Sequence, residues 1–186
     1  MKIVHSLLIA LSVAGMASAQ APSPSAPAPV STGLNANMTG EWVGQLEYRD
    51  FQSDERVFLP TWLSMTPSGD GVSVKLAYTY DDGPAKTVKE VSTLAFALAG
   101  KTASVTSDRD RSSEQYSVAG LEEFAKLNRG TLVLTGPGKE NDKPVDVRIT
   151  LTLRRNLFTW VKETRTVGGE FKFRDGYTLT RRDANM

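Results

Sequence analysis

The chain has 186 residues, with 22 Lys and Arg against 21 Asp and Glu, one His and no Cys. A net charge of +1 leaves no basic surplus of the kind that attracts nucleic acid, so we expect no nucleic-acid partner. Because Cys is absent, the fold has no disulfides and must depend on its core.

The first 19 residues, 1–19, have the pattern of a cleaved secretory signal peptide. Lys2 supplies a positive charge, Leu7 to Ala17 form an apolar run, and the Ala-Ser-Ala of residues 17–19 is a motif that signal peptidase accepts. This run is shorter than the roughly 20 residues that span a bilayer, and no second long apolar run follows. We therefore expect cleavage before Gln20, an exported protein that is periplasmic or secreted, and a mature chain without an integral membrane segment.

The rest of the chain divides by composition. Residues 20–38 are rich in Pro, Ala and Ser, and such a segment buries too little apolar surface to offset its ordering entropy. We interpret 20–38 as a disordered tether. Residues 39–182 have the length of one domain with its own core, and 183–186 form a tail.

Side chains alternate between apolar and polar along most of residues 39–182, which is typical of half-buried β-strands. In the segment 72–80, for example, Leu76 and Tyr78 fall on one face and Lys75 falls on the other. The strands that this alternation predicts are 41–51, 56–65, 72–80, 87–91, 94–98, 101–106, 113–118, 131–135, 145–153, 157–165 and 170–182.

The segments between these strands predict how they are connected. Gly136-Pro137-Gly138 opens a polar loop that we expect to reach Pro144, and 120–128 is the one plausible short helix. Pro60 inside a strand requires a bulge or an edge position. Asp175-Gly176 could be a turn, but we expect the last strand to continue through it. The connections resemble hairpins, which predicts an all-β fold: a closed antiparallel up-and-down β-barrel of about 8–10 strands with at most one short helix.

Two short motifs give the chain a resemblance to a known superfamily. Gly40-Glu41-Trp42 opens the first strand, and Arg181 lies near the end of the last. This arrangement resembles the calycin superfamily, which includes lipocalins, fatty-acid-binding proteins and bacterial lipocalin-like barrels. The resemblance implies that Arg181 packs across the Trp42 indole as a structural pair that closes the barrel.

The residues that the mature chain lacks restrict its chemistry. The only histidine, His5, leaves with the signal peptide, so the mature chain has neither His nor Cys. This excludes Ser-His-Asp and Cys-His nucleophilic sites, the usual zinc ligand sets and haem held by a proximal His. We therefore expect no catalytic residues, no metal site, no cofactor and no enzyme activity.

The aromatic inner face of the expected barrel indicates a binding protein. We expect an exported lipocalin-like barrel that binds a small apolar or amphipathic ligand. The side chains expected to line its ligand site are Tyr48, Leu76, Tyr78, Phe173 and Tyr177. The alternative is a structural or interaction module of the cell envelope, with a packed, ligand-free barrel and a protein partner at exposed residues such as Phe58 and Trp62.

Overall fold

The computed structural model describes residues 33–50 and 52–182. The expected signal peptide, most of the expected tether and the C-terminal tail therefore lie outside the described residues. The elements are β1 (Gly40–Arg49), β2 (Arg56–Pro67), β3 (Ser73–Asp81), β4 (Thr87–Ala97), β5 (Thr102–Ser107), β6 (Ser113–Ala119), α1 (Leu121–Leu127), β7 (Gly130–Glu140), β8 (Lys143–Leu153), β9 (Leu157–Arg165) and β10 (Lys172–Arg181).

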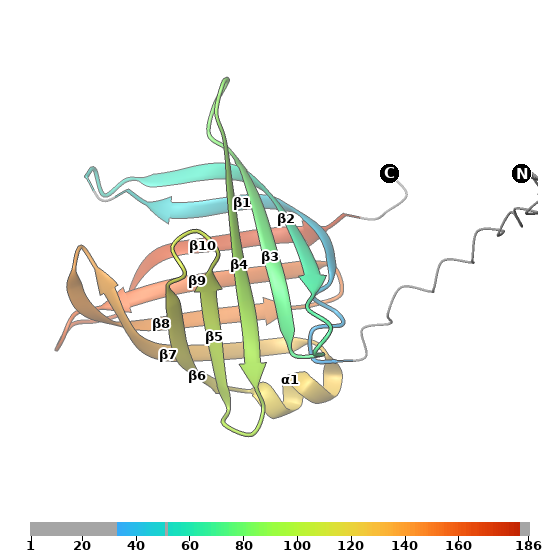
Figure 1. The fold of residues 1–186 in the computed structure, drawn as a ribbon. Coiled ribbons are helices and arrows are strands. Elements are labelled where there is room, and N and C mark those ends of the chain that lie inside the picture. The colour runs from blue at the N-terminus through green and yellow to red at the C-terminus, as the bar shows by residue number, and fades with distance from the viewer. Residues whose placement is uncertain (1–32, 51, 183–186) are drawn as a thin grey trace, which may run out of the picture.

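The ten strands form one closed antiparallel barrel in which every strand pairs with its neighbours in sequence, and β1 pairs with β10 to close the ring (Figure 1). This confirms the predicted fold class, including the up-and-down order and the single short helix among the described residues. Closure gives every strand a partner on both sides, and only segments that extend past a neighbour, such as the start of β2, remain edges. The helix α1, the only one described, is too short to cross a membrane.

Two of the predicted interruptions are absent from the strands. The predicted strands 87–91 and 94–98 are one strand, β4. Ser92 and Thr93, between them, pair with β3 on one side and with β5 on the other. The expected loop from Gly136 to Pro144 is also wrong, since Gly136-Pro137-Gly138 continues β7 and pairs with β8. The glycines are needed there because a Cβ at Gly138 would lie 2.5 Å from the Val147 side chain.

Two other irregular positions behave as the sequence predicted. Pro60 pairs with β1, but the β2–β3 ladder begins only at Thr61, so Pro60 lies where β2 is locally an edge. The last strand does continue through Asp175 and Gly176. A register shift between Phe173 and Asp175 introduces a β-bulge, however, and a bulge changes which face the preceding side chains occupy.

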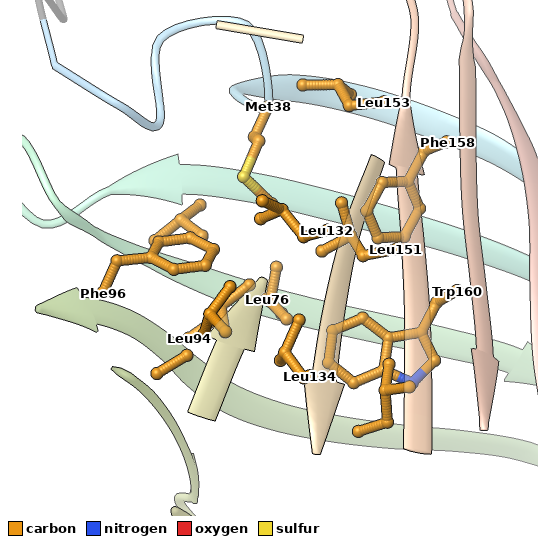
Figure 2. Close-up of a cluster of buried hydrophobic side chains, with 14 of the residues drawn as sticks. Met38, Leu76, Leu94, Phe96, Leu132, Leu134, Leu151, Leu153, Phe158 and Trp160 are labelled. Atoms are coloured by element: carbon orange, nitrogen blue, oxygen red, sulfur yellow. The ribbon is translucent and has the colours of Figure 1, made fainter. Parts of the chain in front are cut away.

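One end of the barrel, which we call the closed end, holds a dry apolar core. Figure 2 shows Leu76, Leu94, Leu151 and Phe158 among the side chains that meet there, each no more than 1% exposed. The helix α1 lies at this end (Figure 1) and contributes two buried apolar side chains. Removing so much apolar surface from water is the main stabilising contribution to a disulfide-free fold.

The residues just before β1 belong to this core. Leu34, Asn35 and Met38 are buried, and Asn35 donates a hydrogen bond of 2.5 Å to the carbonyl of Ser73. The predicted boundary between tether and barrel at residue 39 is therefore wrong, because 33–38 packs against the closed end. The sequence signal was hidden by a Pro-rich composition immediately upstream.

The first and last strands meet at the closed end through the expected aromatic–cation contact. Trp42 and Arg181 are register partners in the β1–β10 ladder, and the guanidinium carbon lies 4.3 Å from the indole centroid. The indole nitrogen donates a hydrogen bond of 2.9 Å to the carbonyl of Met38. The pair thus links β1, β10 and the segment before β1.

Candidate functional site

The inner face of the barrel changes from apolar to polar along its axis. At the end opposite α1, which we call the open end, the same strands that fill the core place tyrosines and charged groups on their inner faces. The strand alternation and register place on this inner face Tyr48, Tyr78, Tyr80, Glu90, Glu114, Tyr116, Lys162, Asp175 and Tyr177. Polar groups concentrated at one end of an otherwise apolar interior mark the candidate site.

Three of these tyrosines, Tyr78, Tyr80 and Tyr177, touch one another and form what we call the tyrosine cluster. Tyr78 and Tyr80 are two residues apart on β3, so their rings lie on the same face, with centroids 5.8 Å apart. Tyr177 on β10 brings its ring within 5.0 Å of Tyr78, and its hydroxyl is 2.8 Å from that of Tyr80. The cluster therefore joins strands that β1 and β2 separate in the ring.

The phenols of the tyrosine cluster are neutral donors and acceptors. Burial raises the pKa of Tyr78, Tyr80 and Tyr177 because the surrounding protein removes the water that would stabilise a phenolate. For Tyr80 the hydrogen bond with Tyr177 opposes this effect, and for Tyr177 the neighbouring Tyr78 adds to it. The hydroxyl of Tyr80 also lies 3.5 Å from a carboxylate oxygen of Glu90 at the barrel mouth.

A second polar group joins β6 and β9, which β7 and β8 separate in the ring. The hydroxyl of Tyr116 donates a hydrogen bond of 2.6 Å to the Glu114 carboxylate. The ammonium of Lys162 lies 3.9 Å from the same carboxylate. Burial, and then Glu114, raises the pKa of Tyr116. The Lys162 and Glu114 side chains are 26% and 41% exposed, so the pair lies on the inner face where solvent still reaches it.

Asp175 lies between these two groups. It is two residues before Tyr177 on β10, on the same face, and it pairs in register with Lys162 on β9. Desolvation is the largest cause that raises the pKa of its carboxyl, and Glu114 and Glu140 raise the pKa further. Lys162 and Arg174 act in the opposite direction. A carboxyl with a raised pKa on the inner face of a barrel is a marker of a functional site.

The rim of the open end has a charged hollow of about 840 Å³ between the β1–β2 and β9–β10 connections. In it, Glu140 accepts a hydrogen bond of 2.8 Å from Thr164 and forms an ion pair of 3.2 Å with Arg174. Phe173 lines this hollow, with the Arg56 guanidinium 4.6 Å from its ring centroid. The hollow is thus a charged surface at the rim whose arginines are paired with carboxylates.

The sequence-predicted ligand residues fall into three places. Tyr48, Tyr78 and Tyr177 lie at the open end, where their predicted role in binding stays a prediction. Leu76 is 1% exposed within the packed core, and its predicted role in binding also stays a prediction. Phe173 lies on the outer face beside Gly176, because the bulge before Asp175 reverses the expected side.

Several residues of the candidate site did not enter the predicted ligand set. Tyr80, Glu114, Lys162 and Asp175 occupy positions that strand alternation places beside apolar inner residues. The sequence did contain a signal for the charged residues, because each occupies a position at which the alternation of its strand predicts an inward, apolar side chain. For Asp175 this signal was ambiguous, since Asp-Gly is also typical of a hairpin turn.

The comparisons with known proteins concern the fold alone. No family model matches the chain, and no curated protein matches it. Among solved structures, an S-type phycobiliprotein lyase (CPES) from Guillardia theta aligns with a TM-score of 0.53 and 9% identity. The alignment covers 81% of this chain and 90% of the lyase chain. The closed ring of ten strands and this likeness together define a lipocalin-like β-barrel.

Proposed function

We propose that this protein is an exported, calycin-type barrel that binds a small amphipathic molecule at the open end of its interior. The observation that carries the proposal is the tyrosine cluster beside Asp175, where phenol rings, phenol hydroxyls and a carboxylate share one inner face. Aromatic surfaces with a few orienting polar groups are typical of small-molecule sites. The lyase of similar fold is named for its action on phycobiliproteins, which is consistent with ligand handling by such barrels.

The packed closed end limits how deep the ligand enters. Leu63, Val74 and Leu94 are completely buried, and the core around them is continuous. A long acyl chain inserted along the barrel axis would have to displace these side chains, at the cost of native packing. The ligand is therefore a compact molecule whose apolar part lies against the tyrosine rings.

The charges at the open end favour a ligand with a positive or hydrogen-bond-donating group. Glu90, Glu114 and Asp175 lie on the inner face with Lys162, while Arg174, the other cation that acts on Asp175, is paired with Glu140. Binding a carboxylate there adds a fourth negative charge, whereas an ammonium group would pair with Asp175 and lie against aromatic faces. We thus propose a compact aromatic or cyclic amine in preference to a fatty acid.

The test compares two ligands that share one ring system and differ in charge. The mature protein is saturated with the fluorescent probe 1-aminoanthracene, and tryptamine or indole-3-acetate is added as competitor. We expect tryptamine to displace the probe at a concentration at least about tenfold lower, equivalent to about 1.4 kcal/mol. Native mass spectrometry of freshly purified protein identifies any molecule that is already bound.

Matched variants separate the site from the rest of the barrel. Tyr78→Leu removes a ring of the cluster, and Phe58→Leu removes an aromatic side chain that is exposed on the outer face. Binding should weaken at least about tenfold in Tyr78→Leu and stay unchanged in Phe58→Leu. Asp175→Asn should reduce the preference for tryptamine. If both leucine variants bind alike, or neither ligand binds, the proposal is wrong.

One observation favours the alternative of an interaction module of the cell envelope. Phe58 and Trp62 lie on the outer face of β2 and are 52% and 44% exposed. Exposed aromatic side chains on one strand are typical of contact surfaces. Loss of a co-purifying envelope protein in Trp62→Ser, with retention in Tyr78→Leu, would favour this module over the binding protein.

Export is tested separately from binding. The segment that carries the expected signal lies outside the described residues, so the proposal depends on the sequence pattern alone. The full-length chain is produced in a Gram-negative host, and its N-terminus is sequenced. We expect the mature protein in the periplasmic or secreted fraction with Gln20 as its first residue. An intact N-terminus in the cytoplasm would exclude export.

A further inference from the structure

Four arginines gather at the closed end, on the opposite side of the molecule from the tyrosine cluster. A hollow of about 460 Å³ is lined by Arg129, Arg154, Arg155 and Arg181 together with the amides of Asn37 and Asn156. We call it the basal arginine pocket. Among the described residues that line it, none is acidic. Because the mature chain is expected to be neutral overall, this is a local excess of positive charge.

The backbone around the basal arginine pocket is tied together by hydrogen bonds. Arg154 and Arg155 form the β8–β9 turn, and the backbone NH of Arg154 donates a 2.8 Å hydrogen bond to the Leu157 carbonyl. The amide of Asn37 donates a 2.8 Å hydrogen bond to the carbonyl of Asn128, next to Arg129. The pocket is therefore built from segments that the fold holds in fixed positions.

Arg181 supplies a charge that is held in place. Its guanidinium donates hydrogen bonds to the carbonyls of Thr39 at 2.6 Å, Arg155 at 3.2 Å and Asn37, and it lies over the Trp42 ring. These contacts with carbonyls and an aromatic face fix the orientation of the guanidinium. A fixed guanidinium at the floor of a pocket attracts an anion without further ordering cost.

The other three arginines are exposed and available. Arg129, Arg154 and Arg155 are exposed and form no ion pair with any carboxylate in residues 33–50 and 52–182. Like charges that share one pocket repel each other, and a multivalent anion relieves that repulsion. The guanidinium group presents paired N–H donors whose planar fork matches phosphate oxygens.

We propose that the basal arginine pocket binds a phosphate group, either on a free phosphorylated molecule or on a lipid headgroup. This site is separate from the ligand site at the open end and does not depend on it. Several guanidinium groups provide more positive charge than one carboxylate neutralises, which favours a phosphate dianion or a diphosphate. Bound at the closed end, such an anion would bridge the β8–β9 turn and the start of β7.

The experiment measures pyrophosphate binding to the mature protein by isothermal titration calorimetry in 150 mM NaCl. The test variant carries Arg154→Gln and Arg155→Gln, and the control variant carries Arg109→Gln and Arg111→Gln. The control arginines are also exposed and lie together in the β5–β6 connection, which is at the open end. We expect affinity to fall at least about tenfold in the test variant only. Circular dichroism verifies that both variants are folded.

A second arm identifies the source of the phosphate. Vesicles of phosphatidylcholine with and without phosphatidic acid are sedimented with each protein. Sedimentation that requires phosphatidic acid and is lost in the test variant indicates a lipid headgroup, whereas pyrophosphate binding without sedimentation indicates a free phosphorylated ligand. Absence of both kinds of binding in the unmodified protein, or equal loss in test and control variants, overturns the proposal.

Discussion

Replacing Arg181 by methionine tests the contact that joins the first and last strands. The change keeps an unbranched side chain of similar length but removes the guanidinium over Trp42 and its hydrogen bonds to the carbonyls of Thr39, Arg155 and Asn37. A partly exposed cation–π contact contributes about 1 kcal/mol. Each hydrogen bond contributes about 0.5–1 kcal/mol net, because these carbonyls border an exposed hollow and can be rehydrated.

The expected loss in the free energy of unfolding is therefore about 3 kcal/mol. For a domain of this size it corresponds to a fall in Tm of about 6–12 °C. Guanidinium chloride denaturation followed by tryptophan fluorescence and circular dichroism measures the change. Arg181→Lys should lose less, because lysine retains the charge but lacks the planar fork.

A double-mutant cycle with Trp42→Phe isolates the aromatic–cation component. We expect a coupling energy of about 0.5–1 kcal/mol, since phenylalanine binds a cation less well than tryptophan does. The reasoning is refuted if Arg181→Met unfolds within about 0.5 kcal/mol of the unmodified protein, the range typical of an ordinary surface substitution.

Three further changes probe the two ends of the barrel. Met38→Ala should lower the free energy of unfolding by about 2–5 kcal/mol in urea, because Met38 is completely buried; a loss below 1 kcal/mol would contradict its place in the core. Burial raises the pKa of the Asp175 carboxyl in the folded protein. Ionising this carboxyl at higher pH therefore lowers the free energy of unfolding, whereas below the ordinary pKa near 3.8 the carboxyl is protonated in both states and has no such effect. Asp175→Asn should therefore raise Tm at pH 7 and have little effect at pH 3, whereas equal shifts at both pH values would argue against a desolvated carboxyl. In an ultraviolet titration, the tyrosine cluster should stay protonated beyond pH 10 and ionise only as stability falls at higher pH; complete, reversible ionisation near pH 10 in the folded protein would contradict its burial.

Much of the fold could be predicted because strand formation is a local property of the sequence. The period-2 pattern of 157–165 matches both bounds of β9, and that of 145–153 matches the end of β8 and starts two residues late. Hairpin connections leave only the first and last strands to close the ring. This supported the contact between Trp42 on the first strand and Arg181 on the last that the resemblance implied.

The errors share one physical cause, which is that contacts distant in sequence decided the outcome. Gly136-Pro137-Gly138 resembles a loop, yet pairing with β8 makes it part of a strand. The segment 33–38 follows a Pro-rich stretch, yet it is buried against the closed end. Phe173 was predicted to face inward but lies on the outer face. The extra residue of the bulge between Phe173 and Asp175 reverses the alternation of β10 at that point.

The amino-acid sequence by itself determined the all-β class, the strand order and the absence of Cys, because these follow from composition and from alternation along single strands. Only the tertiary structure decided which inner residues are packed and which remain accessible, and it alone brought Tyr80 and Tyr177, or the arginines of the closed end, into one place. Depth within a barrel depends on where every strand begins and how it is staggered against its neighbours, and no single strand carries that information.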